Sequence, residues 1–408
     1  MKRVVVTGMS AITALGDTWG EFKTALQKGE NAVQYMTDWD VAPELNTRLA
    51  APVTYFSKPS HYKRKQVRSM GRVALMSTRT TELALEEAGL LDHPSLTDGS
   101  TGIAFGSSTG STPPLLAFAK MMETGEMTGV TATSYIQMMA HTAPVNVGVF
   151  FGLKGRVITT SSACTSGSQG IGYAYEAIKY GRQKAMVAGG AEELCITEAA
   201  VFDTLYATST KNDAAKSTPR PFDQNRDGLV IGEGAGTLIL EEYEHALARG
   251  ATIYAELVGF GCNSDGQHVT QPTAETMQVA IEMALNDAQL TADQIGYVNA
   301  HGTSTDRGDI AESLATFNAL GKKPISSLKS YLGHTLGACG AIEAWASINM
   351  MNDGWFAPTI NLTDVDPECA DLDYIKGNGR DMQTDYIMSN NFAFGGINTS
   401  LIFKKWQA

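Results

Sequence analysis

Short apolar runs alternate with longer amphipathic stretches along most of the chain. Residues 2–8 form a β-branched run that ends in glycine, which indicates a strand. A helical stretch follows over 18–28, and a second helix, rich in Ala, Leu, Met and Glu, is expected over about 69–88. Three more apolar runs predict buried strands, at 101–106, 157–160 and 185–190. This alternation of strands and helices favours an α/β fold.

The same alternation begins again after residue 250. Strands are expected at 255–260, 295–300 and 400–403, and helices at 274–288, 310–319 and 337–352. The two halves have a similar order of elements, without a repeat of fixed period and without a linker rich in Pro or Ser. We therefore expect an N-terminal half over 1–250 and a C-terminal half over 251–408, packed as one body.

Composition and charge narrow the class of protein. The 408 residues are 43% hydrophobic and 18% charged, as in ordinary soluble proteins. The N-terminus turns polar too early for a secretory signal, and no stretch is long enough for a membrane span. The net charge of -12 opposes nucleic-acid binding. The five cysteines are scattered without CxxC spacing, which indicates a reduced, cytoplasmic protein in which one thiol has a special role.

Cys164 is the candidate nucleophile. It lies in the small-residue segment 161–167, where an apolar strand is followed by a helix. A thiol at a helix N-terminus faces the positive end of the helix dipole and unpaired backbone N–H groups, which favour the thiolate and can bind an oxyanion. The alternative is a buried structural cysteine, as most free cysteines are. The other four cysteines lack this setting and keep that interpretation.

Two histidines flanked by glycine are the second candidate group. His301 follows the strand expected at 295–300, at the kind of strand end where α/β sheets hold ligands. His334 stands just before a Gly/Ala-rich helix, with Lys329 nearby. Together with Cys164 they suggest acyl transfer through a thioester, with the imidazoles stabilising developing negative charge. A Cys/His/His zinc site is the alternative, but it would lack a fourth ligand and short-range ligand spacing.

Four motifs together resemble one enzyme family. The segments 160–167, 299–305, 329–338 and 392–398 are similar, in order and separation, to the cysteine motif, the two histidine motifs and the C-terminal glycine-rich loop of elongating β-ketoacyl-acyl-carrier-protein synthases. Further matches at 221–223 and 232–236 extend the resemblance across essentially the whole chain.

The resemblance implies the thiolase fold, in which two similar βαβαβ-type halves stack as a five-layered αβαβα sandwich, usually as a homodimer. The first half carries the nucleophile and the second carries the two histidines. Cys164 would take an acyl group from the phosphopantetheine of an acyl-carrier protein, with the backbone N–H groups of Cys164 and Phe394 as the oxyanion hole. Malonyl-carrier protein would then lose CO₂. The enolate, stabilised by His301 and His334, would attack the acyl-Cys carbonyl, with no cofactor required.

The resemblance also implies roles for residues around this centre. Lys329, together with Glu312, would order the two histidines. Thr303 and Thr305 would hydrogen-bond the pantetheine arm of the substrate. Glu343 matches a family carboxylate, for which an ion pair or cap within the fold and a monovalent-cation ligand are the two interpretations.

Two loops are implied to control access to the centre. Phe394 would gate the acyl group, and its neighbours Gly395 and Gly396 would allow that loop to move. Asp265 and His268 resemble part of a second mobile loop near the site, to which we assign no chemistry.

A basic run stands out in this acidic protein. The cations Lys63, Arg64, Lys65 and Arg68 lie within ten residues, and Lys211 is expected to add to the same rim. The resemblance favours docking of an acidic carrier protein, where complementary potentials steer the encounter. The alternative is a solvated face of the enzyme.

The motifs distinguish this chain from related families. A thiolase would carry a second cysteine where this chain has Phe394-Gly395-Gly396, and an initiating synthase would have Asn in place of His334. A chain-length-factor subunit would lack the nucleophile. We therefore expect a catalytic, elongating enzyme, either a homodimer or the partner of a chain-length-factor-like subunit.

Two departures from the family pattern concern the substrate. Thr109 and the prolines at 113–114 lie where the family lines its acyl pocket, in place of Gly-rich or bulky apolar residues. Asp306 and Arg307 follow the first histidine motif, where a proline is frequent. The expected function is fatty-acid-type chain elongation, and the alternative is a ketosynthase of an aryl-polyene or polyketide pathway.

Overall fold

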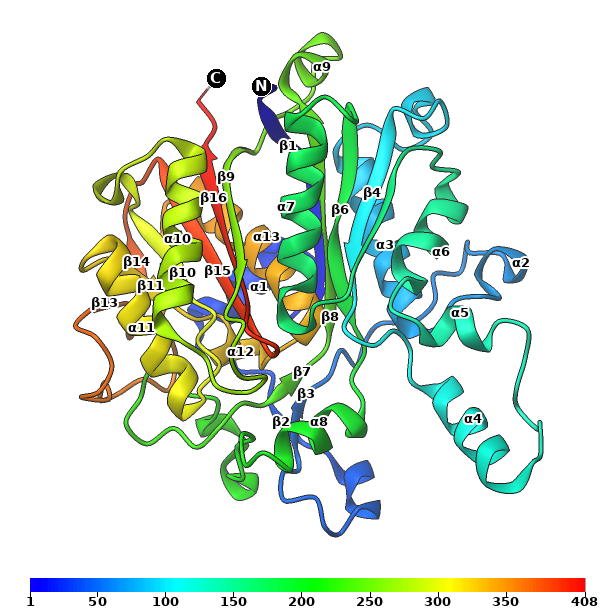
Figure 1. The fold of residues 1–408 in the computed structure, drawn as a ribbon, viewed down its shortest axis with the longest axis horizontal. Helices are drawn as coiled ribbons and strands as arrows, with labels where there is room; N and C mark the ends of the chain where they lie inside the picture. Colours follow the sequence, from blue (N-terminus) through cyan, green and yellow to red (C-terminus); the bar gives the residue numbers. More distant parts are fainter. Residues whose placement is uncertain (408) are drawn as a thin grey trace.

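The computed structural model describes residues 1–407. Its main sheet has 11 strands in the order β13-β11-β10-β15-β16-β9-β1-β8-β6-β4-β5 (Figure 1). β1 (Val4–Thr13) and β9 (Ala255–Ser264) pair through Val4–Val6, and the sheet opens from this junction into two arms.

The strands of the two arms are as follows. Beside β1, the first arm holds β8 (Gly234–Glu242), β6 (Ala185–Glu192), β4 (Thr101–Gly106) and β5 (Val157–Thr160). Beside β9, the second arm holds β16 (Ile397–Lys405), β15 (Tyr386–Ala393), β10 (Tyr297–Asn299), β11 (Pro324–Ser326) and β13 (Asp373–Tyr374).

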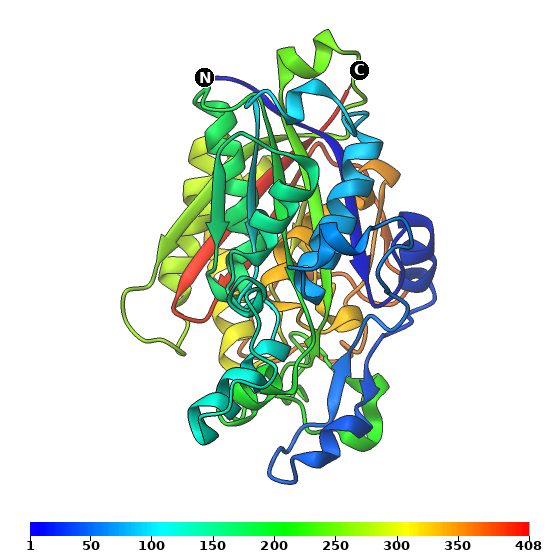
Figure 2. The same ribbon diagram turned by 90° about the vertical axis from the view of Figure 1, so that its right-hand side faces the viewer.

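Helices form three layers around these arms (Figures 1 and 2). α7 (Ser166–Lys179) and α13 (Cys339–Asp353) lie between the arms and contact strands of both. The outer layers are α3 (Arg72–Glu87) with α6 (Thr142–Phe151) on the first arm, and α10 (Ala274–Ala288) with α11 (Asp306–Leu320) on the second. The predicted five-layered αβαβα sandwich is therefore confirmed.

Shorter elements connect and cover these layers. The remaining helices are α1 (Trp19–Gln27), α2 (Arg64–Val67), α4 (Pro113–Thr124), α5 (Ser134–Met138), α8 (Ile196–Asp203), α9 (Tyr243–Ala248) and α12 (Lys329–Leu332). Two small sheets join β2 (Gln34–Tyr35), β3 (Leu49–Ala51) and β7 (Ile231–Gly232), and β12 (Trp355–Phe356) with β14 (Arg380–Asp381). None of the helices within residues 1–407 combines the length and apolar character needed to cross a membrane.

The expected elements are found with differences at their ends, and several further elements were not expected, among them β15. The helix expected over about 69–88 begins at Arg72, after Gly71 in an extended conformation. The helix expected at 310–319 begins earlier, at Asp306, because the polar first turn carries no apolar period that would mark its start. The segment 113–151, for which no element was expected, forms α4, α5 and α6, and α4 and α5 project from the body (Figure 1).

The two central helices approach each other unusually closely at their N-terminal ends. A Cβ atom on Gly167 of α7 would lie 3.0 Å from the backbone N of Ala341, and one on Gly340 of α13 would lie 2.6 Å from the N of Ser168. A Cβ on Gly190 of β6 would lie 2.2 Å from the carbonyl oxygen of Gly337. Glycine at these positions therefore lets the segments before α7 and α13 meet at one end of the sandwich.

Candidate active site

Cys164 sits in a tight turn between β5 and α7. The turn is a short 3-10 segment, Ala163–Thr165, and Ala163 has a φ of 50°, in the left-handed region. Ser166 fixes this geometry, because its hydroxyl donates to the Ala163 carbonyl at 2.7 Å and accepts from the Ser162 N–H at 3.0 Å. The turn points the thiol into the interior, where Cys164 is 2% exposed.

His301 and His334 reach the same point from the second half of the chain. His301 follows β10, and its backbone N–H donates to Glu312 at 2.7 Å. His334 follows α12, and its backbone N–H donates to the Val230 carbonyl at 2.6 Å. Nε2 of His334 lies 2.9 Å from Sγ of Cys164, and the two imidazole rings stand 5.1 Å apart at 88°. The three residues proposed from the sequence therefore form one cluster.

Burial keeps this cluster uncharged at neutral pH. It raises the pKa of the Cys164 thiol to about 11, although Lys329 and the backbone N–H groups of Phe394 and Cys164 act in the opposite direction. Burial also lowers the pKa of His301 and of His334 well below the usual value, and the nearby Lys329 charge adds to this effect. The expectation that the helix N-terminus favours a thiolate is thus outweighed by desolvation.

The two backbone N–H groups that lower the pKa of Cys164 can also take part in the reaction. Those of Phe394 and Cys164 both lower the pKa of the thiol through their interaction with the sulfur. A pair of convergent donors beside a nucleophile can stabilise an oxyanion on the carbonyl that the nucleophile attacks. These are the two groups that the sequence resemblance assigned to the oxyanion hole.

Lys329 is held by a buried ion pair beneath the histidines. It lies 2% exposed and binds Glu343 of α13, which is equally buried. Nδ2 of Asn391 donates to the other Glu343 oxygen at 2.7 Å. Burial acts against the Lys329 charge, but the Glu343 carboxylate, together with Cys339 and Glu312, more than compensates and the pKa of Lys329 is raised.

Glu312 has a separate structural task. Its two carboxylate oxygens accept the backbone N–H groups of His301 and Gly302, at 2.7 and 2.6 Å. It therefore fixes the start of the turn that carries His301. The hydrogen-bonded partner of Lys329 is Glu343, while the charges of Lys329 and Glu312 also stabilise each other.

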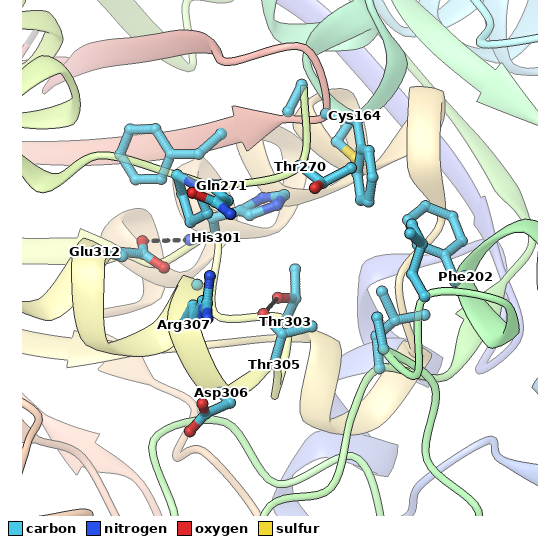
Figure 3. Close-up of a pocket in the computed structure, with 18 of the residues that line it drawn as sticks. Cys164, Phe202, Thr270, Gln271, His301, Thr303, Thr305, Asp306, Arg307 and Glu312 are labelled. Atoms are coloured by element: carbon cyan, nitrogen blue, oxygen red, sulfur yellow. Dashed lines mark hydrogen bonds between the residues drawn. The ribbon is translucent and has the colours of Figure 1, made fainter. Parts of the chain in front are cut away.

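The cluster lies at the inner end of a cavity of about 500 Å³ (Figure 3). Thr303 and Thr305 line it, and their hydroxyls are 2.9 Å apart. Phe394 also lines it and packs edge-on against Phe202, with ring centroids 5.0 Å apart. The cavity thus offers a channel from the surface to Cys164.

Two loops meet beside Phe394. Gly395 and Gly396 have φ values of 86° and 69°, which favour glycine, and the N–H of Gly395 donates to the Val269 carbonyl at 2.8 Å. The backbone N–H of Asp265 donates to the Gly396 carbonyl at 2.7 Å, and both Asp265 and His268 line the cavity. The two loops that the sequence resemblance grouped around the site are therefore in direct contact.

Other sequence candidates lie outside the cavity. Thr109 is exposed in the single chain and its hydroxyl is 3.4 Å from Glu198. The cations Lys63, Arg64, Lys65 and Arg68 are all exposed on or beside α2. Lys211 is half-buried, and its ammonium group donates to the Asn225 carbonyl at 2.7 Å and lies 3.5 Å from Asp227.

Glu192 is a structural residue of the site that sequence reasoning missed. It is fully buried at the end of β6 and accepts hydrogen bonds from Ser107, Ser108 and the Gly337 N–H, at 2.8 to 2.9 Å. It thereby ties the end of β4 to the turn after His334. Its sequence signal was no more than an acidic residue two positions after the apolar strand predicted at 185–190.

A metal ion is poorly matched to this cluster. The donor atoms of Cys164, His301 and His334 lie within 4.8 Å of one another, a spacing that could hold an ion. No fourth His, Cys, Asp or Glu of residues 1–407 joins that group. The positive charge of Lys329, close enough to lower both histidine pKa values, also opposes a divalent cation.

Comparisons with known proteins agree over the full chain. Residues 1–246 match the model for the N-terminal domain of β-ketoacyl synthase, and residues 254–363 match the model for its C-terminal domain. The 3-oxoacyl-[acyl-carrier-protein] synthase 2 of Vibrio harveyi is 39% identical over 413 residues, covering 99% of each chain.

Solved structures give the same result. A β-ketoacyl synthase from Burkholderia phymatum is 63% identical with a TM-score of 0.99, and each chain is covered completely. A type II polyketide ketosynthase, solved in complex with its acyl-carrier protein and bound to the hexaketide, is 31% identical with a TM-score of 0.87, again over both complete chains.

The buried ion pair predicts a double-mutant signature in stability. Lys329→Met leaves the Glu343 charge buried without its partner, and we expect the free energy of unfolding to fall by about 3 kcal/mol. Adding Glu343→Gln removes that charge while Asn391 keeps an acceptor, so the double variant should recover more than half of the loss. Urea denaturation followed by tryptophan fluorescence measures both, and a double variant no more stable than Lys329→Met would contradict the account.

Proposed function

Because the chain belongs to the β-ketoacyl synthase family, we propose that Cys164, His301 and His334 perform the decarboxylative Claisen condensation of this family. The chain has the thiolase fold of ketosynthases. It is an acyltransferase, a β-ketoacyl-[acyl-carrier-protein] synthase of fatty-acid-type elongation. The observation that carries the residue assignment is the 2.9 Å contact of Cys164 Sγ with His334 Nε2 at the end of a substrate-sized cavity.

The first stage transfers an acyl group to Cys164. The thiol is neutral at rest, so its proton must leave as sulfur attacks the thioester carbonyl, and it passes through solvent to the departing phosphopantetheine sulfur. The N–H groups of Cys164 and Phe394 stabilise the tetrahedral oxyanion. When the intermediate collapses, the phosphopantetheine thiol leaves with the proton and the acyl group remains on sulfur.

The second stage forms the carbon–carbon bond. Malonyl-carrier protein loses CO₂, and the electron pair of the broken C–C bond becomes an enolate whose charge lies on the thioester oxygen. Neutral imidazole N–H groups of His301 and His334 donate to that oxygen, in a site from which bulk water is excluded. The enolate carbon attacks the acyl carbonyl, and the thiolate of Cys164 is the leaving group. The thiolate then takes a proton from solvent, which restores the neutral thiol of the resting enzyme.

The surrounding residues position the substrate for both stages. We assign Thr303 and Thr305 to the pantetheine arm, since both line the cavity beside His301. We assign Phe394, with Gly395 and Gly396, to gating of the acyl group. The substrates arrive on the phosphopantetheine of a carrier protein, so no free cofactor is needed, and the five free cysteines fit a reducing, cytoplasmic compartment.

Two assignments rest on the family resemblance together with the burial pattern. Thr109 belongs to the acyl pocket, which a second subunit would complete because Thr109 is exposed in the single chain. A monovalent cation beside Glu343 fits the donors present, since the buried amide oxygens of Asn299 and Asn391 lack a hydrogen-bond partner. The cation would supply positive charge beneath the site.

Intact-protein mass spectrometry separates the two stages. Incubation with a panel of acyl-carrier proteins should add one acyl group to the wild type and none to Cys164→Ala. His301→Ala and His334→Ala should still load to a substantial extent, but condensation with malonyl-carrier protein should fall at least about a hundredfold, since donors to the enolate are lost. Cys262→Ala is the matched control, and an acyl group found on another cysteine would refute the nucleophile.

The exposed basic run at α2 is the proposed docking surface for the carrier protein. Lys63, Arg64, Lys65 and Arg68 have no ion-pair partner within residues 1–407, and carrier proteins are acidic. Lys211, near the cavity, would contribute to the same rim although it is partly engaged by Asp227.

Charge reversal tests this surface. Lys63→Glu/Arg64→Glu should weaken binding of holo carrier protein about tenfold at low salt, and the difference should shrink at high salt because screening removes it. The control is Arg182→Glu/Lys184→Glu, which lies in the turn after the C-terminus of α7, away from α2. It changes the net charge equally and should leave the affinity for the carrier protein within twofold. Calorimetry measures the affinity. If both pairs of substitutions weakened carrier-protein binding equally, the basic run at α2 would be a solvated surface and not a docking site.

The free edge of the main sheet indicates a dimer. β5 is the last strand of the first arm, and Val157 on it is 51% exposed. The neighbouring segment 113–151 exposes large apolar side chains, namely Leu115, Leu116, Met122, Met127, Tyr135, Met139 and Val149. An unpaired strand edge beside so much exposed apolar surface is covered in most proteins, and a second copy of this chain would cover it.

Sedimentation velocity measures this directly. The purified chain should sediment at twice its own mass, and Val149→Lys/Val157→Lys should shift it to a monomer, since each charge would be buried at the interface. A monomeric wild type that assembles only with a chain-length-factor-like subunit would contradict the homodimer.

A further inference from the structure

One cation on the cavity wall has no protein partner. Arg307 is the second residue of α11 and lines the cavity close to its opening, where it is exposed. Figure 3 places Arg307 and Glu312 on one side of the cavity and Phe202 on the other. Within residues 1–407, the Arg307 guanidinium makes no hydrogen bond and no ion pair.

The other charged side chains of this wall already have ion-pair or hydrogen-bond partners within the protein. Arg226 binds Asp366 at 2.5 Å and contacts Asp306 and Asp309. Asp227 accepts hydrogen bonds from the Ser209 hydroxyl and the Thr210 N–H, both at 3.0 Å. The Asp306 side chain, next to Arg307 in sequence, is therefore drawn toward Arg226.

The remaining two acids do not neutralise Arg307 either. Asp265 accepts from Asn398 at 2.7 Å and from Thr276. Glu312 accepts two backbone N–H groups, and burial raises its pKa to about 8. The cavity wall consequently keeps one free positive charge, at the position of Arg307.

The segment 301–307 runs from the reacting centre to the surface. His301 and Thr303 are buried, Thr305 is half-buried, and Arg307 is exposed. A Cβ on Gly308 would lie 2.4 Å from the Thr305 hydroxyl, so the first turn of α11 packs tightly against Thr305. A long flexible substrate arm that reaches Cys164 along the two threonines would leave its outer end beside Arg307.

We propose that Arg307 binds the phosphodiester of the phosphopantetheine arm. The inference rests on the proposed function, which supplies a substrate with a thioester at one end and an anionic phosphodiester at the other. The guanidinium fork matches two phosphate oxygens and carries a permanent charge.

The malonyl carboxylate is the other anion that the reaction brings in. It must reach the buried histidines to lose CO₂ beside them, whereas Arg307 is exposed at the opening. The phosphodiester is therefore the better-placed partner. The loading stage contains no malonyl group, so a measurement of that stage alone distinguishes the two anions.

The experiment compares two small thioesters of the acyl chain that loads fastest from the carrier-protein panel. One is the phosphopantetheine thioester and the other is the pantetheine thioester, which lacks the phosphate. Rates of Cys164 acylation as a function of concentration give kcat and KM for each. Arg307→Ala should raise KM for the phosphorylated thioester about tenfold, with little change in kcat, and should leave the pantetheine thioester unaffected.

Two further variants make the result specific. Arg307→Lys keeps a charge without the fork and should fall between the wild type and Arg307→Ala. Arg182→Ala changes an exposed arginine in the turn after the C-terminus of α7, and it should behave as the wild type with both thioesters. With holo acyl-carrier protein as donor, Arg307→Ala should show the same direction of change.

The outcomes separate the inference from the function beneath it. Equal losses with both thioesters would show that Arg307 shapes the path rather than binding phosphate, and no loss with either would make it a solvated surface arginine. A defect seen only when malonyl-carrier protein is added would assign it to the malonyl carboxylate. Each of these overturns the proposal, while a wild type that loads from neither thioester nor carrier protein would overturn the proposed function itself.

Discussion

The buried ion pair between Lys329 and Glu343 is the constraint on which the reacting centre depends. It places a positive charge, 2% exposed, next to a thiol and two imidazoles. That charge lowers the pKa of both histidines and partly opposes the rise in the pKa of Cys164. The centre can therefore bind developing negative charge without itself holding a net charge at rest. A single buried lysine without Glu343 would not remain ionised at this depth.

The pair also joins the layers of the fold. Lys329 comes from α12 of the second half, Glu343 from the central helix α13, and Asn391 from β15. α13 in turn packs against α7 through Gly167 and Gly340, which brings the turn with Cys164 to the segment with His334. The same contacts that close the sandwich thus set the sulfur–imidazole distance, and a Cβ at the crossing would alter both.

The residues of the centre were predictable from the sequence because each lies in a local signal. Cys164 stands at a strand-to-helix turn, His301 at a strand end, and His334 before a Gly/Ala-rich helix, and neighbours in the chain define all three settings. The α/β class followed from the alternation of apolar runs, and the five-layered architecture from the family resemblance. The start of α11 was not predictable, because Asp306 and its polar neighbours show no helical period.

What the sequence did not contain were quantities that depend on tertiary packing. A helix N-terminus alone favours a thiolate at Cys164, but complete burial reverses the sign of the net effect. The choice of Glu343 over Glu312 as the partner of Lys329 depends on which helix faces α12, since both carboxylates are buried nearby. For the same reason Glu192 could not be recognised, because its three donors come from two separate turns.

Charge is distributed along the cavity in a way that fits a substrate carried on a long arm. The inner end has a neutral thiol and neutral imidazoles above a compensated ion pair, so a thioester meets donors there and no competing counter-ion. The opening has Arg307 without a partner, and the outer surface has the basic run of α2. Permanent charges at the rim attract an anionic carrier protein at little desolvation cost. The same charges at the inner end would bind the malonyl thioester, the enolate and the product equally, so they would not lower the barrier to the reaction. Keeping the free cations outside and the compensated one inside lets binding and transition-state stabilisation act on different parts of one substrate.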